Sequence, residues 1–327
     1  MKLRTKSILF ALLVILIALT GYYGHAFYSF FTGVQEPNIV KTHGADGKTK
    51  PPESEIPVWG GTERVNILLM GVDRRELRPD EQPRSDSMIL VSIDPVAKTY
   101  DLFSILRDTY VKIPGYGSSR INAALAEGGP ELAMETVSSF VGLPVDRYVI
   151  TDFEGFKHLI DAVGGVELDV EKNMRYRDPS DKGLYDINLK KGLQHLDGDK
   201  ALQYVRFRHD AMSDYTRTER QRKLLSALAV QMQKGTTILQ LPAVLDSIRP
   251  YVQTNMSAGD MLKLAALSLQ LKSEQAGQYQ LPPMGAFQEA NRGGSVLLPN
   301  LEQVKSYVQE QLNRPRAATQ TQSPDKP

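Results

Sequence analysis

The stretch that decides the fold begins with Val205-Arg206-Phe207-Arg208-His209-Asp210 and continues in Asp214-Tyr215-Thr216-Arg217-Thr218-Glu219-Arg220-Gln221. Polar and apolar residues alternate over residues 204–208, and this period of two predicts a strand. Such a strand would place Arg206 and Arg208 on one face, two residues apart.

From Thr216 onward the spacing of apolar residues changes to that of a helix, with Leu224, Leu225, Leu228, Ala229 and Met232 on one stripe. Arg217 and Gln221 lie on the same stripe, so both should face inward. A buried guanidinium without a partner costs several kcal/mol or more, so an anionic group is expected between strand and helix. That group is either an internal carboxylate, from Asp210, Asp214 or Glu219, or a bound oxyanion. Several converging arginines favour the oxyanion, because their forks match phosphate oxygens.

Three buried strands are predicted upstream, over residues 65–70, 88–93 and 100–106, and charged residues gather at their ends. Asp73 follows the first strand and Asp86 precedes the second, so antiparallel pairing would bring both to one sheet edge. Arg84 and Arg107 lie close by in the sequence. Two carboxylates completed by waters and phosphate oxygens are a typical Mg²⁺ site, which Mn²⁺ could also occupy. Either aspartate alone could instead serve in a turn or a cap.

The remaining pattern predicts an α/β fold, a three-layer α-β-α arrangement with a central mixed sheet, preceded by one transmembrane helix. The further expected elements are helices over 131–140, 153–162, 238–245 and 258–271 and from Asn300, which can cap its helix, and strands over 148–150, 166–170 and 295–298.

The N-terminus has Lys2, Arg4 and Lys6 before an apolar run, which predicts a signal peptide or a membrane anchor. An uncleaved anchor is favoured, since no convincing cleavage site ends the run and it is long enough to span a bilayer. The basic flank would keep the N-terminus in the cytoplasm and place the rest outside the cell. We expect a tip and anchor over 1–34, a flexible stalk over 35–59, one domain over 60–313 and a disordered tail over 314–327.

The composition is nearly neutral, with 39 Lys and Arg against 38 Asp and Glu, and gives no indication of nucleic-acid binding. Cysteine is absent. Disulfides, thiolate metal sites and thiol nucleophiles are therefore excluded.

Taken together, seven motifs over residues 65–234 resemble the LytR-CpsA-Psr family of membrane-anchored proteins. They are Gly71-Val72-Asp73 with Arg75, Arg84-Ser85-Asp86-Ser87-Met88, Ile105-Leu106-Arg107-Asp108-Thr109, Ile121-Asn122-Ala123-Ala124 with Gly128-Gly129, Asp161-Ala162-Val163-Gly164-Gly165-Val166, Ala201-Leu202-Gln203-Tyr204-Val205-Arg206-Phe207-Arg208 and Arg217-Thr218-Glu219-Arg220-Gln221. The family often has Pro before the Arg-Asp of the third strand, where this chain has Leu106.

The resemblance implies a Mg²⁺-dependent phosphotransferase of cell-wall assembly. Such an enzyme moves a glycopolymer (teichoic acid, capsular or related polysaccharide) from a polyprenyl-pyrophosphate carrier to peptidoglycan and forms a phosphodiester. By motif, Asp73 and Asp86 would be the metal ligands and Asp214 a general base, with Arg206 and Arg208 catalytic. The pyrophosphate would be held by Arg75, Arg84, Arg107, Arg206, Arg208, Arg217 and Gln221, with Arg120 as a less certain member.

Three other functions remain open at this point. Water could replace the sugar hydroxyl, which would make the protein a hydrolase of the same lipid pyrophosphates. The protein could capture lipid-linked glycans without turnover, although paired aspartates among arginines argue for a metal. The family name also suggests a membrane-associated transcriptional attenuator, but basic and acidic residues alternate here and the predicted topology places the domain outside the cell.

Overall fold

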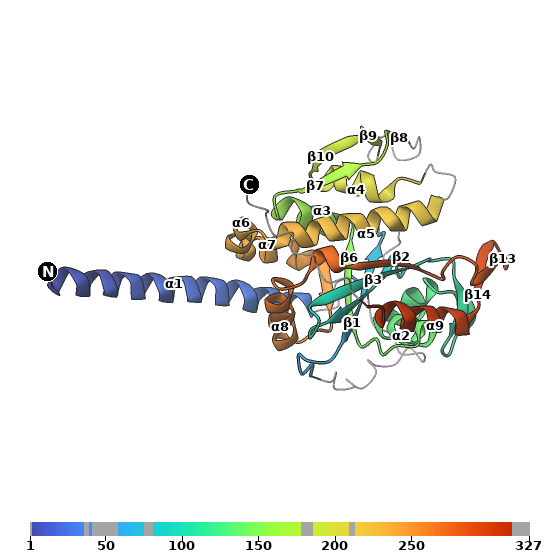
Figure 1. Ribbon diagram of the computed structural model, residues 1–327, viewed down its shortest axis with the longest axis horizontal. Helices are drawn as coiled ribbons and strands as arrows, with labels where there is room; N and C mark the ends of the chain where they lie inside the picture. The colour runs from blue at the N-terminus through green and yellow to red at the C-terminus, as the bar shows by residue number, and fades with distance from the viewer. Residues whose placement is uncertain are drawn as a thin grey trace, which may run out of the picture.

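The computed structural model describes residues 2–35, 39–40, 58–74, 81–177, 186–208 and 213–315. Within these residues the centre of the fold is a six-stranded mixed sheet (Figure 1). Its strand order is β11–β6–β1–β2–β3–β12, with β1 at Val65–Val72, β2 at Ser85–Asp94, β3 at Thr99–Ile105, β6 at Arg147–Asp152, β11 at Val252–Thr254 and β12 at Gly277–Leu281. β2 is antiparallel to β1 and β3, whereas β6 and β12 run parallel to β1 and β3.

One face of the sheet is covered by α2 (Ala123–Val141) and α9 (Leu301–Leu312). Leu68, Met70 and Val72 alternate along β1 and join these helices in a buried cluster. α2 has non-helical backbone at Gly128 and Gly129, just before Pro130, so its regular part matches the expected helix over 131–140. Asn300 caps α9 as expected, since its Oδ1 accepts the Gln303 amide at 3.2 Å.

The other face is covered by α5 (Ser213–Met232) and α8 (Ala258–Ser268), whose apolar side chains pack with the remaining face of β1 and β2. Trp59 is also buried in this cluster. The predicted three layers with a central mixed sheet are therefore confirmed (Figure 1).

A further group of elements packs on the outer side of α5, around its own apolar cluster. It consists of α3 (Phe153–Ala162), β7 (Val166–Val170), β8 (Met174–Tyr176), β9 (Ile187–Leu189), β10 (Gly192–Leu196) and α4 (Gly198–Arg206). The expected strand over 166–170 is confirmed as β7, and it pairs with β10 outside the central sheet. The other small elements are β4 (Tyr110–Ile113), β5 (Gly117–Arg120), η3 (Ser273–Gln275), β13 (Phe287–Asn291) and β14 (Ser295–Pro299).

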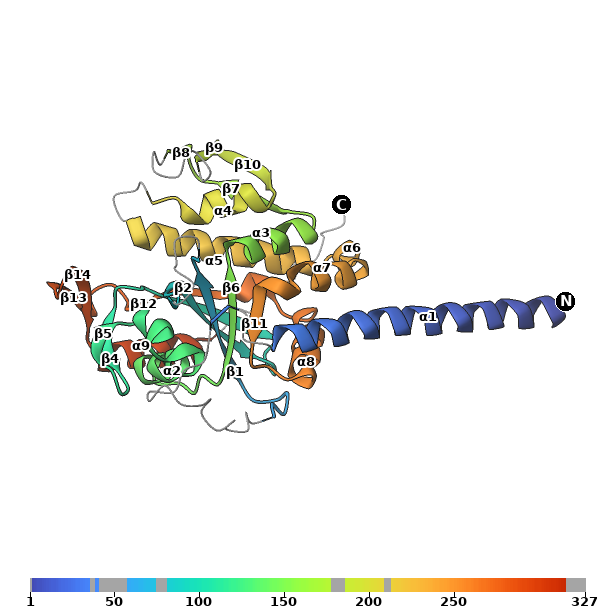
Figure 2. The ribbon, with the colours of Figure 1, turned by 180° about the vertical axis from the view of Figure 1, so that it is seen from behind.

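The N-terminal helix α1 (Lys2–Val34) projects from the domain, and its inner end packs beside α7 (Leu241–Ile248), η2 (Arg249–Tyr251) and β11 (Figure 2). Its residues Leu13–Val34 are the one stretch within the described chain that is long and apolar enough to cross a membrane. Between α5 and α7 lies the short helix α6 (Gly235–Leu239). The single helix expected over 238–245 is thus divided at Gln240, where Pro242 enters the first turn of α7.

Part of the expected stalk is packed against the domain. Ile39 and Val40 are buried, and their backbone amides donate to Gln253 Oε1 at 3.2 and 2.9 Å. These two residues therefore do not belong to a free stalk. Residues 36–38 and 41–57 of the stalk fall outside the described residues, as does the tail from 316.

Candidate functional site

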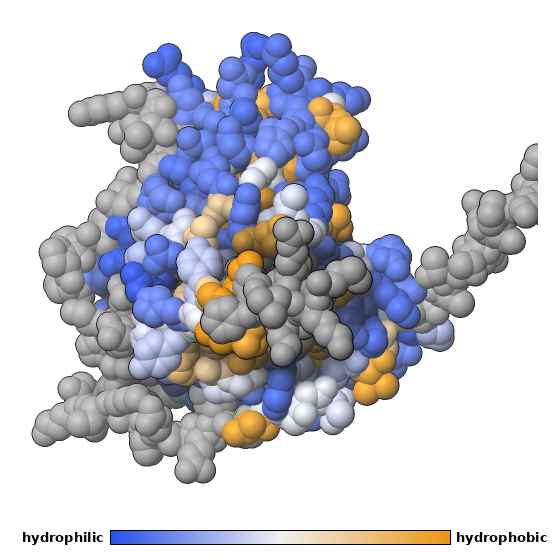
Figure 3. Space-filling view, turned by 90° about the vertical axis from the view of Figure 1, so that its left-hand side faces the viewer, coloured by the Kyte–Doolittle hydropathy of each residue, from blue (hydrophilic) through white to orange (hydrophobic). Residues whose placement is uncertain are grey.

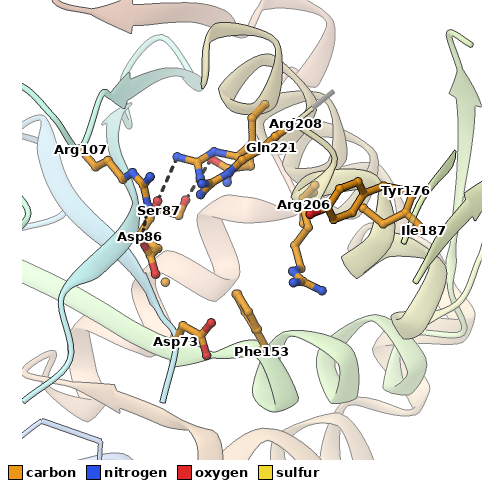
Figure 4. A pocket seen from close by; sticks show the side chains of 13 residues that line it. Asp73, Asp86, Ser87, Arg107, Phe153, Tyr176, Ile187, Arg206, Arg208 and Gln221 are labelled. Atoms are coloured by element: carbon orange, nitrogen blue, oxygen red, sulfur yellow. Dashed lines mark hydrogen bonds and ion pairs between the residues drawn. The ribbon is translucent and has the colours of Figure 1, made fainter. Parts of the chain in front are cut away.

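A cavity of about 400 Å³ opens where β1 ends and β2 begins (Figure 4). Its wall combines charged and apolar side chains from both sides of α5. The lining residues are Gly71, Asp73, Asp86, Ser87, Arg107, Phe153, Tyr176, Ile187, Val205, Arg206, Arg208, Arg217 and Gln221.

The two aspartates lie on adjacent strand ends, as predicted. Val72 pairs with Ser85 after a shift in register, which brings Asp73 and Asp86 to one edge of the sheet. Figure 4 shows both carboxylates on the same wall of the cavity. Asp86 Oδ1 also accepts a hydrogen bond from Arg107 Nη1 at 2.7 Å. This charge-assisted contact orients the carboxylate toward the end of β3.

Helix α5 adds Arg217 and Gln221, which lie one turn apart, to the wall of the cavity. Arg217 is only 4% exposed, and its Nη2 donates to the backbone oxygen of Asp86 at 3.3 Å. Ser87 Oγ donates to Gln221 Oε1 at 3.0 Å. The prediction that this helix face points inward is confirmed, and both contacts fasten α5 to β2.

The predicted strand over 204–208 is wrong, because these residues form the end of a helix and the first residues after it. Helix α4 begins after Asp197, whose Oδ1 accepts the Lys200 amide at 2.9 Å, and it ends at Arg206. Its buried residues recur at helical spacing and are Ala201, Leu202, Tyr204 and Val205. The backbone becomes extended at Phe207.

Arg206 and Arg208 nevertheless both line the cavity, one from the last turn of α4 and the other from the segment after it. The guanidinium of Arg206 lies 5.5 Å from the centre of the Phe153 ring and extends into the cavity beside it (Figure 4). Arg206 and Arg208 therefore reach the cavity from a helical and a non-helical backbone, and not from one face of a strand.

The segment that carries these two arginines is held by a network behind the cavity, in which Arg220 and Tyr204 are buried and Glu171 is exposed. Arg220 Nη1 donates to the Phe207 backbone oxygen at 2.9 Å, and Arg220 Nε pairs with Glu171 Oε1 at 2.7 Å. Tyr204 donates to the other oxygen of Glu171 at 3.0 Å. Burial raises the pKa of Glu171, but its own backbone amide, Arg220 and Tyr204 outweigh this and leave the pKa below its ordinary value.

Four other predicted site residues are not placed in the cavity wall. Arg84 is exposed just before β2. Arg120 lies on β5, where its Nε pairs with Asp108 Oδ1 at 3.2 Å. Arg75 and the side chain of Asp214 fall outside the described part of the chain, although the backbone of Asp214 lies in the first turn of α5.

The sequence did not indicate the apolar lining residues. Phe153 could have been found, since it follows β6, which runs parallel to β1 and ends at the same sheet edge. Tyr176 and Ile187 face each other across the small β8–β9 pair and carry no sequence signal of their own.

The cavity suits a metal-assisted oxyanion site. In the part of the chain that the structure describes, no group of three or more His, Cys, Asp or Glu could hold a metal by itself. Two carboxylates fit an ion such as Mg²⁺, which takes oxygen ligands and keeps several waters. Among the described residues four arginines share the wall, namely Arg107, Arg206, Arg208 and Arg217. The site can therefore neutralise a multiply charged phosphate ligand.

The fold and the site define an α/β protein with an oxyanion-binding cavity of aspartates and arginines. Comparison with known proteins gives a family with the same motifs. A profile of the LytR_cpsA_psr family matches residues 29–313, and the chain belongs to this family. It is 32% identical over 291 residues to the regulatory protein MsrR of Staphylococcus aureus strain COL, covering 88% of this chain and 84% of the relative.

Two further relatives, TagU and TagV, are named as polyisoprenyl-teichoic acid–peptidoglycan teichoic acid transferases. The chain is 35% identical over 253 residues to the polyisoprenyl-teichoic acid–peptidoglycan teichoic acid transferase TagU of Enterococcus faecalis, covering 77% of this chain and 80% of the relative. The crystal structure of Bacillus subtilis TagV superposes with a TM-score of 0.64 at 31% identity, covering 78% of this chain and 99% of that one.

Proposed function

We propose that this protein transfers a glycopolymer, such as teichoic acid or a related polysaccharide, from a polyprenyl-pyrophosphate carrier to peptidoglycan through a phosphodiester. The observation that carries the proposal is the cavity in which Asp73 and Asp86 share a wall with the cluster of arginines. The name of TagU supports the choice of donor and acceptor.

The arginines would bind the pyrophosphate and stabilise the charge that develops on its oxygens and on the leaving phosphate. Arg217 is the most firmly fixed of them, since it is buried and bonded to the backbone of β2. Arg206 lies on Phe153, and its guanidinium is thereby placed in the cavity. Preset donors of this kind need little rearrangement when the phosphoryl group is transferred.

Asp73 and Asp86 would hold Mg²⁺, or Mn²⁺ in its place, with waters and phosphate oxygens completing the coordination. The bound ion supplies Lewis-acid stabilisation of the phosphoryl oxygens. Asp214, in the first turn of the helix that carries Arg217, would accept the proton of the attacking sugar hydroxyl, the role that the family motif implies.

The prenyl chain would lie between the sheet and α5. Leu69, Val91 and Val149 belong to three neighbouring central strands and yet are only partly buried, and they pack in the same cluster as Leu225 of α5. An apolar floor that begins beside the pyrophosphate cavity suits a hydrocarbon chain, since removing each CH₂ from water contributes about 0.8 kcal/mol. α1 would anchor the protein in the cell membrane, with the N-terminus in the cytoplasm and the domain outside.

Support for a regulatory role comes from the names of relatives, such as the regulatory protein MsrR. The described arginines of the site lie in a cavity among aspartates, whereas a nucleic-acid surface presents exposed basic side chains. The transferase is therefore the preferred function.

The test is reconstitution of the full-length protein in vesicles with a prenyl-pyrophosphate-linked oligosaccharide, a peptidoglycan fragment and Mg²⁺. We expect mass spectrometry to detect an oligosaccharide joined to peptidoglycan by a phosphodiester, and chelation of the metal to abolish it. Release of free oligosaccharide phosphate in place of this product would identify a hydrolase. Absence of both products, with carrier bound, would identify a capture protein.

A further inference from the structure

The inner end of α1 is packed against the folded domain and held there by hydrogen bonds. Val34 is fully buried, and the adjacent Gln35 donates through Nε2 to the Met256 backbone oxygen at 3.1 Å. Arg249 Nη1 donates to Ser29 Oγ at 2.6 Å, one to two turns before the end of the helix. The domain is therefore fixed to the end of α1, so one of its faces must lie close to any membrane that α1 crosses.

The length of α1 determines how close that face lies. Its 33 residues correspond to about 50 Å, whereas the hydrocarbon core is about 30 Å thick, or about 20 residues. Counted from Lys6, the last basic residue at the N-terminus, twenty residues end at Ala26, so the outer boundary falls within about one turn of Tyr22 and Tyr23, residue types that favour the interface. Tyr23 donates its hydroxyl to the Leu239 backbone oxygen at 3.0 Å. Helix α6 therefore lies at the height of the outer lipid interface.

The domain surface at this height combines exposed apolar and basic side chains. Leu239 at the end of α6 is 73% exposed, and Leu269 after α8 is 51% exposed. The two regions are connected, because Gln233 Nε2 donates to the backbone oxygens of Ser268 and Leu271 at 2.7 and 3.2 Å. Lys234 and Lys272 are exposed beside them. Figure 3 views the molecule from the free end of α1 and shows apolar patches among hydrophilic ones on this face.

We propose that this surface, the membrane-side rim of Lys234, Leu239, Leu269 and Lys272, is a second membrane contact that seats the domain on the outer leaflet. Leu239 inserts beside α1 into the interface, Leu269 lies in the shallower layer, and the two lysines reach lipid phosphates. Apolar side chains flanked by lysines are typical of surfaces that lie in a lipid interface. The inference rests on the proposed membrane crossing of α1 and adds to it an orientation of the catalytic domain.

The orientation matters because the cavity lies at the far end of the sheet from the rim. Lys272 donates its amide to the Lys98 backbone oxygen in the β2–β3 turn, whereas the cavity lies where β2 begins. A strand of eight residues, such as β1, spans about 26 Å. A prenyl chain must cover this distance from the bilayer to the cavity. With the rim seated, the chain passes from lipid into protein without crossing water, which would expose its apolar surface.

The absence of cysteine from the chain makes the contact directly measurable. Single cysteines placed in the full-length protein by Leu239→Cys and Leu269→Cys can carry a fluorophore that is quenched by nitroxide-labelled lipids in vesicles. Met284→Cys is the matched control, since Met284 is 67% exposed and follows β12, whose end lies beside the end of β3 at the cavity side. Tyr22→Cys reports on α1 itself.

We expect strong quenching at position 22, clear quenching at 239, weaker quenching at 269 and none at 284. Quenching at 22 without any at 239 and 269 would overturn the rim and leave the anchor intact. Absence of quenching at 22 would overturn the anchor and the rim together. Equal quenching at 284 would mean that the whole domain contacts lipid, and would also overturn the proposal.

A functional measurement separates orientation from chemistry. The double variant Leu239→Asp, Leu269→Asp should lower transfer from a long-chain carrier in vesicles by about tenfold, because two apolar contacts with lipid are lost. Transfer from a short, water-soluble prenyl-pyrophosphate analogue should be unchanged, since neither residue lies near the cavity. Unchanged transfer from both donors would contradict the proposal. Loss with both donors, accompanied by altered circular dichroism, would attribute the effect to folding and likewise count against it.

Discussion

At the scale of single residues, the arginines of the cavity differ in how they are held. Arg217 and Arg107 bond to the two ends of the same residue, Asp86, through its backbone oxygen and its carboxylate. Arg206 is held by the ring of Phe153. Each of these contacts leaves further N–H groups of the guanidinium for phosphate oxygens, and a lysine ammonium cannot reproduce their planar fork.

We therefore expect Arg206→Lys to reduce transfer by about 10²-fold, since a preset donor to the phosphoryl group is lost while the charge remains. Arg292→Lys, on the exposed turn between β13 and β14, is the control and should have no effect. Initial rates at saturating carrier provide the measurement. Full activity of Arg206→Lys would show that only the charge matters.

Asp214 and Asp73 can be separated by comparing binding with turnover. Asp214→Asn should slow transfer by about 10²-fold to 10⁴-fold and leave the affinity for a short prenyl-pyrophosphate analogue nearly unchanged, because a proton acceptor acts only in the reaction. Asp73→Asn should weaken Mg²⁺-dependent binding as well as the rate, because a metal bridge already exists in the ground state. If Asp214→Asn weakens binding as much as it slows turnover, Asp214 organises the arginines instead.

At the scale of elements, the site depends on the segment that follows α4, whose Phe207 is tied to α5 through Arg220. The exposed fraction of the Arg220 side chain is 2%, and it contacts both Phe207 and Glu171. The network behind the cavity therefore fixes the backbone from which Arg206 and Arg208 extend.

This network should make the free energy of unfolding depend on pH in the acid range. The pKa of Glu171 is lowered in the folded protein, so its contribution is present above the ordinary carboxyl value and is lost as the pH falls through the folded pKa. We expect the melting temperature of the wild type to fall more steeply below about pH 4.5 than that of Glu171→Gln. Glu154→Gln, an exposed carboxylate on α3, is the matched control. If the melting temperatures of the wild type and Glu171→Gln fall equally with pH, Glu171 does not contribute to stability in the way described.

The sequence predicted most of the elements because their apolar spacing is long and regular, as in β1, β2 and α5. It also predicted that Asp73 and Asp86 meet, since antiparallel pairing of neighbouring strands follows from chain order. The strand predicted around Arg206 was wrong for a physical reason. Five residues can satisfy a period of two and a helical period at once, and the Asp197 cap that decides for the helix lies outside that window.

The cavity wall formed by Tyr176 and Ile187 could not be predicted from the sequence. These residues reach the site only because the β7–β10 region packs on the outer side of α5, a tertiary contact without local sequence signal. Ile39 and Val40 were missed for the same reason, because two apolar residues in a polar stretch gave no sign that Gln253 would bind their backbone.

At the scale of the whole molecule, the proposed path of the prenyl chain between the sheet and α5 can be tested by filling it with a larger side chain. Val149→Trp would add a large side chain to the partly buried floor beneath α5. We expect transfer from a long-chain carrier to fall by about 5-fold to 150-fold, since overpacking a lined groove costs about 1–3 kcal/mol. Transfer from a short-chain analogue should fall less.

Leu193→Trp is the control for Val149→Trp, because Leu193 is 75% exposed on β10. Both variants need comparable circular dichroism and melting temperatures before their rates are compared. Equal loss with long and short donors would place the prenyl chain elsewhere.

Helix α5 joins both ends of this arrangement, with Arg217 in its second turn and Lys234 just past its last residue. The sixteen helical residues from Arg217 to Met232 correspond to about 24 Å. In the proposed binding mode, the length of α5 sets the height of the reacting phosphate above the bilayer. It therefore sets the minimum length of a prenyl chain that can reach the cavity from the bilayer. A carrier too short to span this length would have to leave the membrane completely to be used, whereas a longer one keeps its far end dissolved in lipid throughout the reaction.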